Sequence, residues 1–326
     1  MATSISELEA EPVLEDTRRR PFRRLMQILL LLIALILAGT WWSLSQIPRI
    51  PDLTAIEPTV GSGTFLLIGS DSRENLPEDL AGEFGSFAGQ RSDLIMLARP
   101  SGGTLHLLSL PRDLKVDIPG HGINKINAAY AFGGPNLLAQ TVTGATGLAI
   151  HHVVEIDFGG FAALVDSVGG INLEFPYAAR DAKSGLDVAA GTTHIDGATA
   201  LAFVRSRSYQ EFRDGSWVSV DADDLGRTTR QQRALTALMG RIASPSGLVR
   251  GPILVGTLDQ ALSADENFGV INALATAFNM RSATVDGATL PVRFSNEGGV
   301  SYVVADGDKA ADMLNRFASG AVLAEG

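Results

Sequence analysis

The sequence contains no cysteine, so disulfide bonds, thiolate zinc sites, iron–sulfur clusters and cysteine nucleophiles are all excluded. It also lacks an excess of positive charge, because 26 Lys and Arg residues stand against 36 Asp and Glu residues and give a net charge of −10. Proteins that bind nucleic acid usually carry the opposite sign, and we therefore expect no nucleic-acid partner. With 45% hydrophobic and 19% charged residues, the chain has the composition of a folded protein.

One hydrophobic segment near the N-terminus is long enough to cross a membrane. Residues 25–44 carry no charge, and 20 residues in a helix span about 30 Å, the thickness of the hydrocarbon core of a bilayer. Five arginines stand shortly before the segment, and this asymmetry keeps the N-terminus in the cytoplasm. The alternative is a cleaved signal peptide, but the segment is long for one and ends in Trp41 and Trp42 instead of small residues. We expect a single-pass protein of the cell membrane with an extracytoplasmic C-terminal domain.

The chain after this segment predicts one α/β domain. We expect a cytoplasmic tail at 1–24, the transmembrane anchor at 25–44, a linker rich in Pro and Gly at 45–64 and the domain at 65–326. Short apolar runs predict strands at 65–68, 94–98, 105–110, 151–156, 171–175, 201–207 and 302–304. Helical spacing predicts helices at 158–168, 223–242, 266–280 and 308–318. The strand–helix–strand order between 151 and 175 favours a mixed or partly parallel sheet covered by helices.

Charged residues gather at the ends of the predicted strands. Arg205 and Arg207 lie side by side at the end of the predicted strand 201–207, and two such like charges are favourable when an anion lies between them. In the helix that follows, Arg227 and Gln231 extend the buried stripe back to the first turns, where the helix dipole also favours an anion. The charged residues at the other strand ends are Asp71, Arg91, Asp93 and Arg112.

Two of these residues, Asp71 and Asp93, form a predicted pair of carboxylates. Such a pair suits Mg²⁺ or Mn²⁺, which proteins often hold with one or two carboxylates while substrate phosphates complete the coordination. Taken singly, each charged residue also has a structural interpretation: Asp71 is typical of a turn, and Arg227 could pair with a nearby acid. The joint pattern favours phosphate binding. We interpret Asp166 as structural, supporting a turn, and the histidines show no metal-ligand spacing.

Six blocks of the sequence, taken in order, carry a resemblance to a known family. They are FLLIGSDSR (65–73), GQRSDLIML (89–97), LLSLPRDLKVDIPGHGINKINAAYAFGG (107–134), VVEIDFGGFAALVDSVGGINL (153–173), HIDGATALAFVRSR (194–207) and DDLGRTTRQQ (223–232). Together they resemble the LytR-CpsA-Psr family of bacterial cell-envelope phosphotransferases. A short cytoplasmic tail followed by one anchor is similar to the usual layout of that family.

The resemblance implies a fold, an activity and roles for individual residues. The implied fold is an α/β/α sandwich with a mixed central sheet and a hydrophobic pocket for a lipid. The implied activity transfers a glycopolymer phosphate from a polyprenyl-pyrophosphate carrier to a hydroxyl of peptidoglycan, or of another envelope acceptor, and releases the lipid phosphate. By position, Asp71 and Asp93 match the metal-binding aspartates and form the expected catalytic set together with Arg91. The positions that match pyrophosphate-binding residues are Arg91, Arg112, Arg205, Arg207, Arg227 and Gln231.

Two other activities are compatible with the same residues. A pyrophosphatase would split the pyrophosphate with water, and a non-catalytic binder would hold lipid-linked glycans without reacting. The aspartate pair argues against the binder, because binding alone needs only the arginines. A membrane-bound transcription regulator is disfavoured, since 24 cytoplasmic residues are too few for a DNA-reading domain. We also expect the glycine-rich stretch 74–90 to be a mobile active-site flap whose amide exchange slows when carrier lipid binds.

Overall fold

The structure is a computed structural model, and it describes residue 42 and residues 45–51, 53–57, 63–70, 92–220, 224–244, 246, 250–265 and 284–323. The chain divides into two compact units, Met1–Trp42 and Ser43–Gly326. Within the described ranges, no helix is long and apolar enough to span a bilayer. The predicted anchor lies outside those ranges except for residue 42, and the predicted flap 74–90 and helix 266–280 lie wholly outside them.

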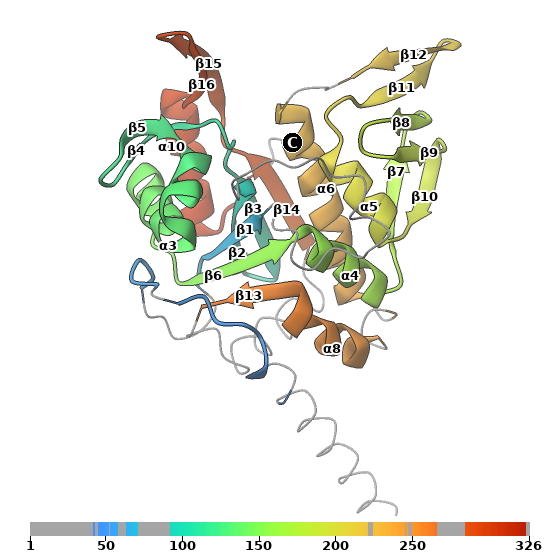
Figure 1. Cartoon of the computed structure of the whole chain (residues 1–326), viewed down its shortest axis with the longest axis horizontal. Helices are drawn as coiled ribbons and strands as arrows, with labels where there is room; N and C mark the ends of the chain where they lie inside the picture. Colours follow the sequence, from blue (N-terminus) through green and yellow to red (C-terminus); the bar gives the residue numbers. More distant parts are fainter. Residues whose placement is uncertain are drawn as a thin grey trace, which may run out of the picture. The chain divides into compact units, whose positions relative to one another are not determined.

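The centre of the second unit is a six-stranded sheet with the order β13–β6–β1–β2–β3–β14 (Figure 1). Its strands are β1 (Phe65–Ser70), β2 (Ser92–Ser101), β3 (Thr104–Ser109), β6 (His152–Asp157), β13 (Leu262–Ala264) and β14 (Thr284–Thr289). β1 runs parallel to β6 and β3 runs parallel to β14, whereas the pairs β1–β2, β2–β3 and β6–β13 are antiparallel. The predicted mixed sheet is therefore confirmed.

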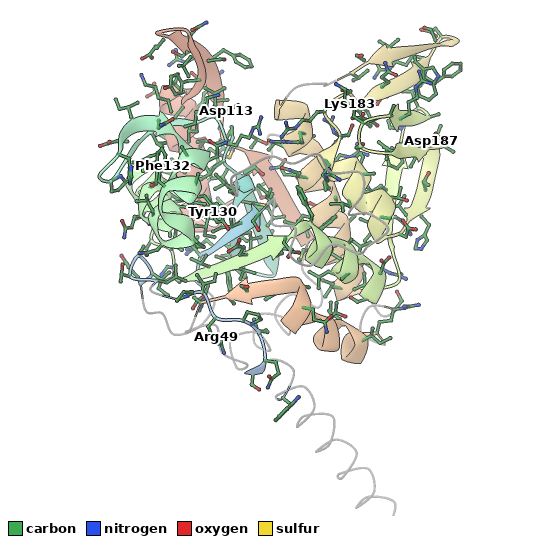
Figure 2. The ribbon with its side chains drawn as sticks, in the orientation of Figure 1. Arg49, Asp113, Tyr130, Phe132, Lys183 and Asp187 are labelled. Atoms are coloured by element: carbon green, nitrogen blue, oxygen red, sulfur yellow. The ribbon has the colours of Figure 1, made fainter. Side chains whose placement is uncertain are left out.

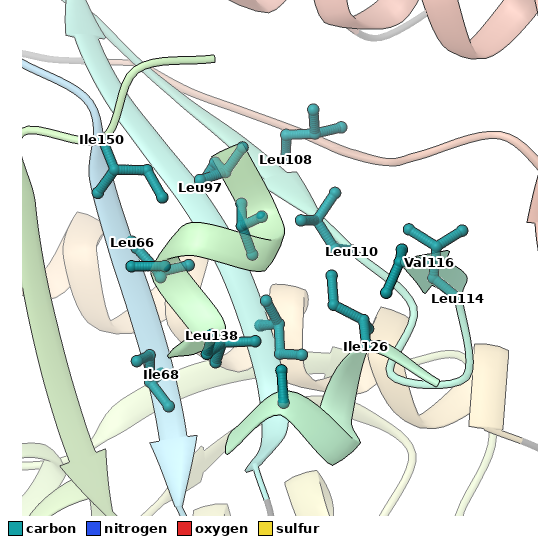
Figure 3. Packing of buried hydrophobic residues seen from close by; sticks show 14 of the residues in the cluster. Leu66, Ile68, Leu97, Leu108, Leu110, Leu114, Val116, Ile126, Leu138 and Ile150 are labelled. Carbon is teal, nitrogen blue, oxygen red and sulfur yellow. The ribbon is translucent and has the colours of Figure 1, made fainter. Parts of the chain in front are cut away.

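Helices cover both faces of this sheet, as an α/β/α sandwich requires. Alternate residues of a strand point to opposite faces, and β1 follows this rule. Leu66 and Ile68 pack with Leu138 of α3 (Ile126–Thr146), in a core that α10 (Gly307–Ser319) also joins (Figure 3). Phe65 packs on the other face with Leu235 of α6 (Asp224–Ala243). Both faces of β1 are thus buried, which explains why its sequence is continuously apolar.

α3 is not among the predicted helices, because Gly133, Gly134 and Pro135 interrupt its pattern. Gly134 has a φ of 63°, a left-handed value that glycine adopts at little cost, and the helix is kinked there. Pro135 then opens the second half of the helix, where its missing N–H costs no hydrogen bond. The hairpin of β4 (Lys115–Ile118) and β5 (Gly122–Lys125) leads directly into α3.

A second group of elements packs with α6 in a core of its own. It consists of α4 (Phe158–Ser167), β7 (Ile171–Phe175), β8 (Ala179–Asp181), β9 (Leu186–Val188), β10 (Gly191–Ile195), α5 (Gly197–Arg205), β11 (Gln210–Arg213) and β12 (Ser216–Ser219). The predicted helix 158–168 and strand 171–175 are confirmed as α4 and β7. β7 pairs with β10 and not with the central sheet, so the unit β6–α4–β7 contributes no parallel pair. The parallel pairs of the sheet come from β1–β6 and β3–β14 instead.

The prediction of a strand at 201–207 is wrong, because residues 197–205 form α5. The side chain of Asp196 caps this helix by accepting a hydrogen bond from the Thr199 N–H at 2.9 Å. Residues 200–204 are all buried, so the helix shows no one-sided apolar stripe, and a short apolar run of this kind fits a buried strand equally well. Arg205 therefore lies at the C-terminus of a helix, where the helix dipole itself favours a cation. The argument from two like charges on one strand face no longer applies to Arg205 and Arg207.

The C-terminal part adds α8 (Gly251–Ala261) and the hairpin of β15 (Val292–Glu297) and β16 (Val300–Ala305). The predicted helix 223–242 is confirmed as α6, and the predicted elements at 302–304 and 308–318 are confirmed within β16 and α10. Part of the predicted linker packs on the same unit: Ile47 and Ile50 are buried, and the backbone N–H of Ile50 donates to the carbonyl of Ala264 at 2.9 Å.

Candidate functional site

The candidate site lies at one edge of the central sheet, where several strands end or begin together. Ser70, the last residue of β1, is paired with Asp157 at the end of β6 and with Ser92 at the start of β2. Asp71 follows Ser70 in the sequence, and Asp93 follows Ser92. Asp71 and Arg91 lie outside the described residues, and Asp93 is described only as a backbone position in β2. The register therefore brings the chain to one sheet edge directly before both predicted metal ligands.

Arg205 connects this edge to the arginines of the helical side. Its guanidinium carbon lies 5.3 Å from the centre of the Phe158 ring, close enough for a cation–π contact. Phe158 is the first residue of α4 and follows Asp157, the β6 residue that pairs with Ser70. The contact thus places Arg205 at the sheet edge where β1 and β6 end.

The turn that carries Arg207 is held by Asp181, a residue of β8 that is only 1% exposed. One carboxylate oxygen of Asp181 accepts three hydrogen bonds, from the Ser206 hydroxyl at 2.7 Å and from the backbone N–H groups of Arg207 at 2.9 Å and Ser208 at 2.7 Å. The other oxygen accepts from the N–H of Lys183 at 2.9 Å. Asp181 therefore fixes the direction in which the chain leaves α5.

These hydrogen bonds also set the protonation state of Asp181. Burial acts to raise the pKa of its carboxyl group, but the bonds from Ser206, Ser208, Lys183 and Arg207 together outweigh burial and lower the pKa below its ordinary value of 3.8. Asp181 is consequently ionised at neutral pH. Sequence reasoning missed this residue, because a single aspartate in the stretch 176–183 carries no spacing that distinguishes it from a surface turn.

Two further predicted residues, Arg227 and Gln231, lie on α6 and are 2% and 8% exposed. They are one helical turn apart and share a face, as the sequence predicts. Arg230, 3% exposed, belongs to the same stretch; its guanidinium donates to the carbonyl of Ser206 at 2.8 Å. Arg230 therefore ties the first part of α6 to the end of α5, next to Arg205 and Arg207. Burial of three such polar side chains in one helix is costly unless they have charged or polar partners.

Arg112 lies after β3, at the same end of the sheet. It is partly buried, and its Nε lies 3.8 Å from Asp113, whose other carboxylate oxygen accepts from Lys125 at 2.9 Å. Figure 2 labels Asp113 on the side of the molecule that carries α3, whereas Lys183 lies on the side of α5 and β8. α6 packs against both β14 and β3, and this packing joins the two sides. Arg112 thus comes from a different element than the group formed by Arg205, Arg207, Arg227 and Gln231.

Asp166 has the structural role that the sequence predicts. Its carboxylate accepts a hydrogen bond from the N–H of Gly197 at 2.7 Å and so attaches the start of α5 to α4. Any side chain at residue 197 would collide with the carbonyl of Ala162, only 2.3 Å from an added Cβ. Asp166 therefore supports the helix that carries Arg205.

A hydrogen bond between a buried tyrosine and a partly buried glutamate joins α3 to the sheet. The Tyr130 hydroxyl donates to a carboxylate oxygen of Glu155 on β6; Tyr130 is labelled in Figure 2. Burial, the hydrogen bond to Glu155 and its negative charge raise the pKa of Tyr130 well above the ordinary value of 10.0. Tyr130 is therefore a permanent donor that holds the kinked helix against β6.

Replacing Tyr130 with Phe should lower the free energy of unfolding by about 1–2 kcal/mol, because Glu155 loses its donor. Urea unfolding monitored by circular dichroism measures the change. Tyr177→Phe is the matched control, since Tyr177 is 42% exposed and its hydroxyl keeps access to water in the folded protein. Equal losses in the two variants would show that the Tyr130 hydrogen bond contributes nothing.

Among the side chains that the structure describes, no three histidines or acids come together to form a metal site. The predicted Mg²⁺ or Mn²⁺ ligands, Asp71 and Asp93, lie outside that set. The described neighbours are compatible with such a site: Ser70 and Ser92, which precede them, are paired and buried at the sheet edge. One or two carboxylates, with substrate phosphates completing the coordination, are the donor set expected for Mg²⁺.

Comparison with known proteins places these features in context. The family model described as LytR_cpsA_psr matches residues 52–319. The probable cell wall biosynthesis protein LcpB of Corynebacterium glutamicum is 40% identical over 222 residues, which make up 67% of this chain and 51% of LcpB. The chain thus matches about half the length of that relative. The polyisoprenyl-teichoic acid–peptidoglycan teichoic acid transferase TagU of Oceanobacillus iheyensis is 30% identical over 266 residues, 78% of this chain and 75% of TagU.

Solved structures show the same fold. A LytR-Csp2A-Psr enzyme from Actinomyces oris superposes with a TM-score of 0.65 at 26% identity, covering 83% of this chain and 96% of that enzyme. TagT bound to LI-WTA superposes with a TM-score of 0.60 at 24% identity and covers 83% of this chain and 95% of TagT.

Proposed function

The chain belongs to the LytR-CpsA-Psr family, and on this premise we propose that it transfers a glycopolymer phosphate from a polyprenyl-pyrophosphate carrier to a hydroxyl of peptidoglycan. The observation that carries the proposal is the contact of Arg205 with Phe158. This contact brings the arginines of α5 and α6 to the edge of the sheet where Ser70 and Ser92 lie. Asp71 and Asp93 are the next residues in the sequence. A pyrophosphate needs such a combination of forked cationic donors and carboxylates beside it.

The reaction is a displacement at phosphorus. The acceptor oxygen forms a bond to the phosphorus atom that carries the sugar, and the bond from this phosphorus to the bridging oxygen breaks. Lipid monophosphate departs with the bridging oxygen, and the hydroxyl proton ends on this phosphate or in the solvent. Six side chains bind the pyrophosphate oxygens and neutralise the charge that grows on them: Arg91, Arg112, Arg205, Arg207, Arg227 and the amide of Gln231. A divalent metal held by Asp71 and Asp93 would withdraw charge from the phosphates.

A membrane anchor fits the proposed reaction, because the lipid carrier lies in the membrane and peptidoglycan lies outside it. We assign residues 25–44 to a single span with a cytoplasmic N-terminus, which puts the domain outside the cytoplasm next to its lipid carrier and to peptidoglycan. The flanking arginines and the uncharged run support this assignment.

Release of lipid monophosphate from a polyprenyl-pyrophosphate glycan tests the proposal. The full-length protein in detergent should release lipid monophosphate only with Mg²⁺ or Mn²⁺, and faster when peptidoglycan is present. The variants Asp71→Asn and Arg205→Ala should release none. Arg293→Ala is the matched control, because Arg293 is an exposed arginine of β15 paired with Asp306 at 2.8 Å. Release that ignores peptidoglycan would indicate a pyrophosphatase, and tight binding without release would indicate a binder.

A further inference from the structure

The hairpin of β11 and β12 extends from the small four-stranded sheet at the end of the molecule nearest the start of α6 (Figure 1). It exposes aromatic surface that the fold does not need. Phe212 is 44% exposed and lies directly opposite Trp217 in the register, with ring centres 5.3 Å apart. Phe212 is exposed and Trp217 is partly exposed, so the hairpin leaves aromatic surface available for contact with another molecule.

Two polar side chains lie on the same face as these rings. Gln210 and Phe212 are two residues apart on β11, so their side chains point to the same face of the strand. Gln210 is paired with Arg180 of β8, whose side chain therefore lies on this face as well. The Arg180 guanidinium carbon lies 4.0 Å from the centre of the Trp217 ring, and its Nε donates to the Gln210 amide oxygen at 3.0 Å. Arg180, Gln210, Phe212 and Trp217 form one continuous surface, here called the hairpin platform. The opposite face of β11 carries Glu211, which is buried against the domain.

This composition fits a saccharide better than a protein or a lipid. The exposed ring of Phe212 can stack on the C–H face of a pyranose, while Arg180 covers the ring of Trp217. The N–H groups of Arg180 and Gln210 that these two side chains do not use between themselves can donate to the hydroxyl, acetamido or phosphate oxygens of a saccharide. Arg180 is an exposed cation in a chain of net charge −10, so it favours an anionic glycan. An apolar lipid chain would offer no acceptor to the remaining N–H groups of Arg180 and Gln210.

The platform begins where the arginine group ends. Gln210 is three residues after Arg207, a separation of at most about 10 Å along the chain. Arg180 directly precedes Asp181 on β8; its exposed side chain points to the opposite face of the strand from the buried Asp181 carboxylate, which holds the turn of residues 206–208. A sugar attached to a pyrophosphate at Arg205 and Arg207 therefore reaches the platform within its first few units.

We propose that the hairpin platform binds the saccharide units of the lipid-linked donor that lie next to its pyrophosphate. This inference rests on the proposed function and extends it, because it assigns the donor's sugars to a surface outside the phosphate site. The platform selects donors that carry a glycan over bare lipid pyrophosphate.

Calorimetric titration of the full-length protein in detergent tests the inference with two probes. One is farnesyl pyrophosphate, and the other is farnesyl pyrophosphate that carries a disaccharide of N-acetylhexosamines. The wild type should bind the sugar-bearing probe about tenfold more tightly, the factor expected from one or two aromatic contacts. Phe212→Ser and Arg180→Ala should reduce this preference to near one while binding of bare farnesyl pyrophosphate stays unchanged. The unchanged binding also shows that each variant is folded.

Val218→Ala is the matched control, since Val218 is 42% exposed on the opposite face of β12 next to Trp217, and its preference should equal that of the wild type. A preference that survives in both platform variants would overturn the inference, as would a wild type that binds both probes equally. A third titration uses a soluble peptidoglycan disaccharide-peptide: if the platform variants lose this binding instead, the surface serves the acceptor and the inference is wrong. If neither farnesyl probe binds the wild type, the proposed function itself fails together with the inference.

Discussion

Replacing Asp181 with Asn should reduce transfer at least about 100-fold, because displacing Arg205 and Arg207 by even 1 Å removes their alignment with the pyrophosphate. The amide of Asn would place an NH₂ group against donors in either orientation: against the Lys183 N–H, or against the three donors of Ser206, Arg207 and Ser208. Because this buried NH₂ group would face other hydrogen-bond donors and find no acceptor, the substitution should also lower the free energy of unfolding by about 2–3 kcal/mol.

The same variant should change how stability depends on pH. The pKa of Asp181 is lowered in the folded protein, so its contribution to stability is complete above 3.8 and is lost as the pH falls through the folded value. The wild type should therefore lose more stability than Asp181→Asn on acidification below about pH 4. Asp117→Asn is the control, since Asp117 is an exposed aspartate of β4, and it should match the wild type in activity and in acid unfolding. Full activity of Asp181→Asn would disprove a positioning role for this carboxylate.

Replacing Arg227 with Met should lower kcat/KM by about 10²–10³, the usual cost of losing one group that stabilises transition-state charge. Arg227 is 2% exposed on α6 and shares a face with Gln231. Arg227→Lys should give an intermediate value, because lysine keeps the charge but cannot bind two phosphate oxygens in a fork.

Arg233 is the matched control for Arg227, because it lies on the same helix and has a structural role. Its guanidinium donates to the carbonyl of Glu174 and lies 5.3 Å from the ring centre of Phe203. Arg233→Met should lower the free energy of unfolding by about 1–2 kcal/mol and leave kcat/KM per folded molecule unchanged. Steady-state kinetics combined with urea unfolding separates the two effects. Equal kinetic losses in both variants would mean that Arg227 acts only through stability.

The fold was predictable where a single periodicity dominates. β1 begins as a continuous apolar run, β6 has the apolar pair Val153 and Val154 at its centre, and α6 has a clear stripe that ends in Arg227 and Gln231, so the type of each element follows from the sequence. α5 was not predictable in this way, because it is buried on all sides and its capping residue Asp196 is the main sign of a helix. α3 was not predicted for a different reason, because the kink at Gly133 and Gly134 divides it into two short pieces.

The candidate site residues were chosen from their chemistry, and their roles stay predictions. Arginines and aspartates at element ends indicate phosphate binding even when one of the elements, α5, is assigned the wrong secondary structure. The residues that hold those groups in place carry no such signal. Asp181 and Arg230 act on the turn around Ser206 through the folded arrangement of β8, α5 and α6, and only the three-dimensional structure brings these segments together.

The central claim is that phosphate moves from the lipid carrier to peptidoglycan. The most direct measurement labels the phosphate next to the sugar with ³²P in a polyprenyl-pyrophosphate glycan and follows it in the presence of intact peptidoglycan and Mg²⁺. The account predicts that the label becomes covalently attached to peptidoglycan while unlabelled lipid monophosphate is released. Label recovered as soluble glycan phosphate would contradict it in favour of hydrolysis, and label that stays in the lipid would contradict it in favour of a binder.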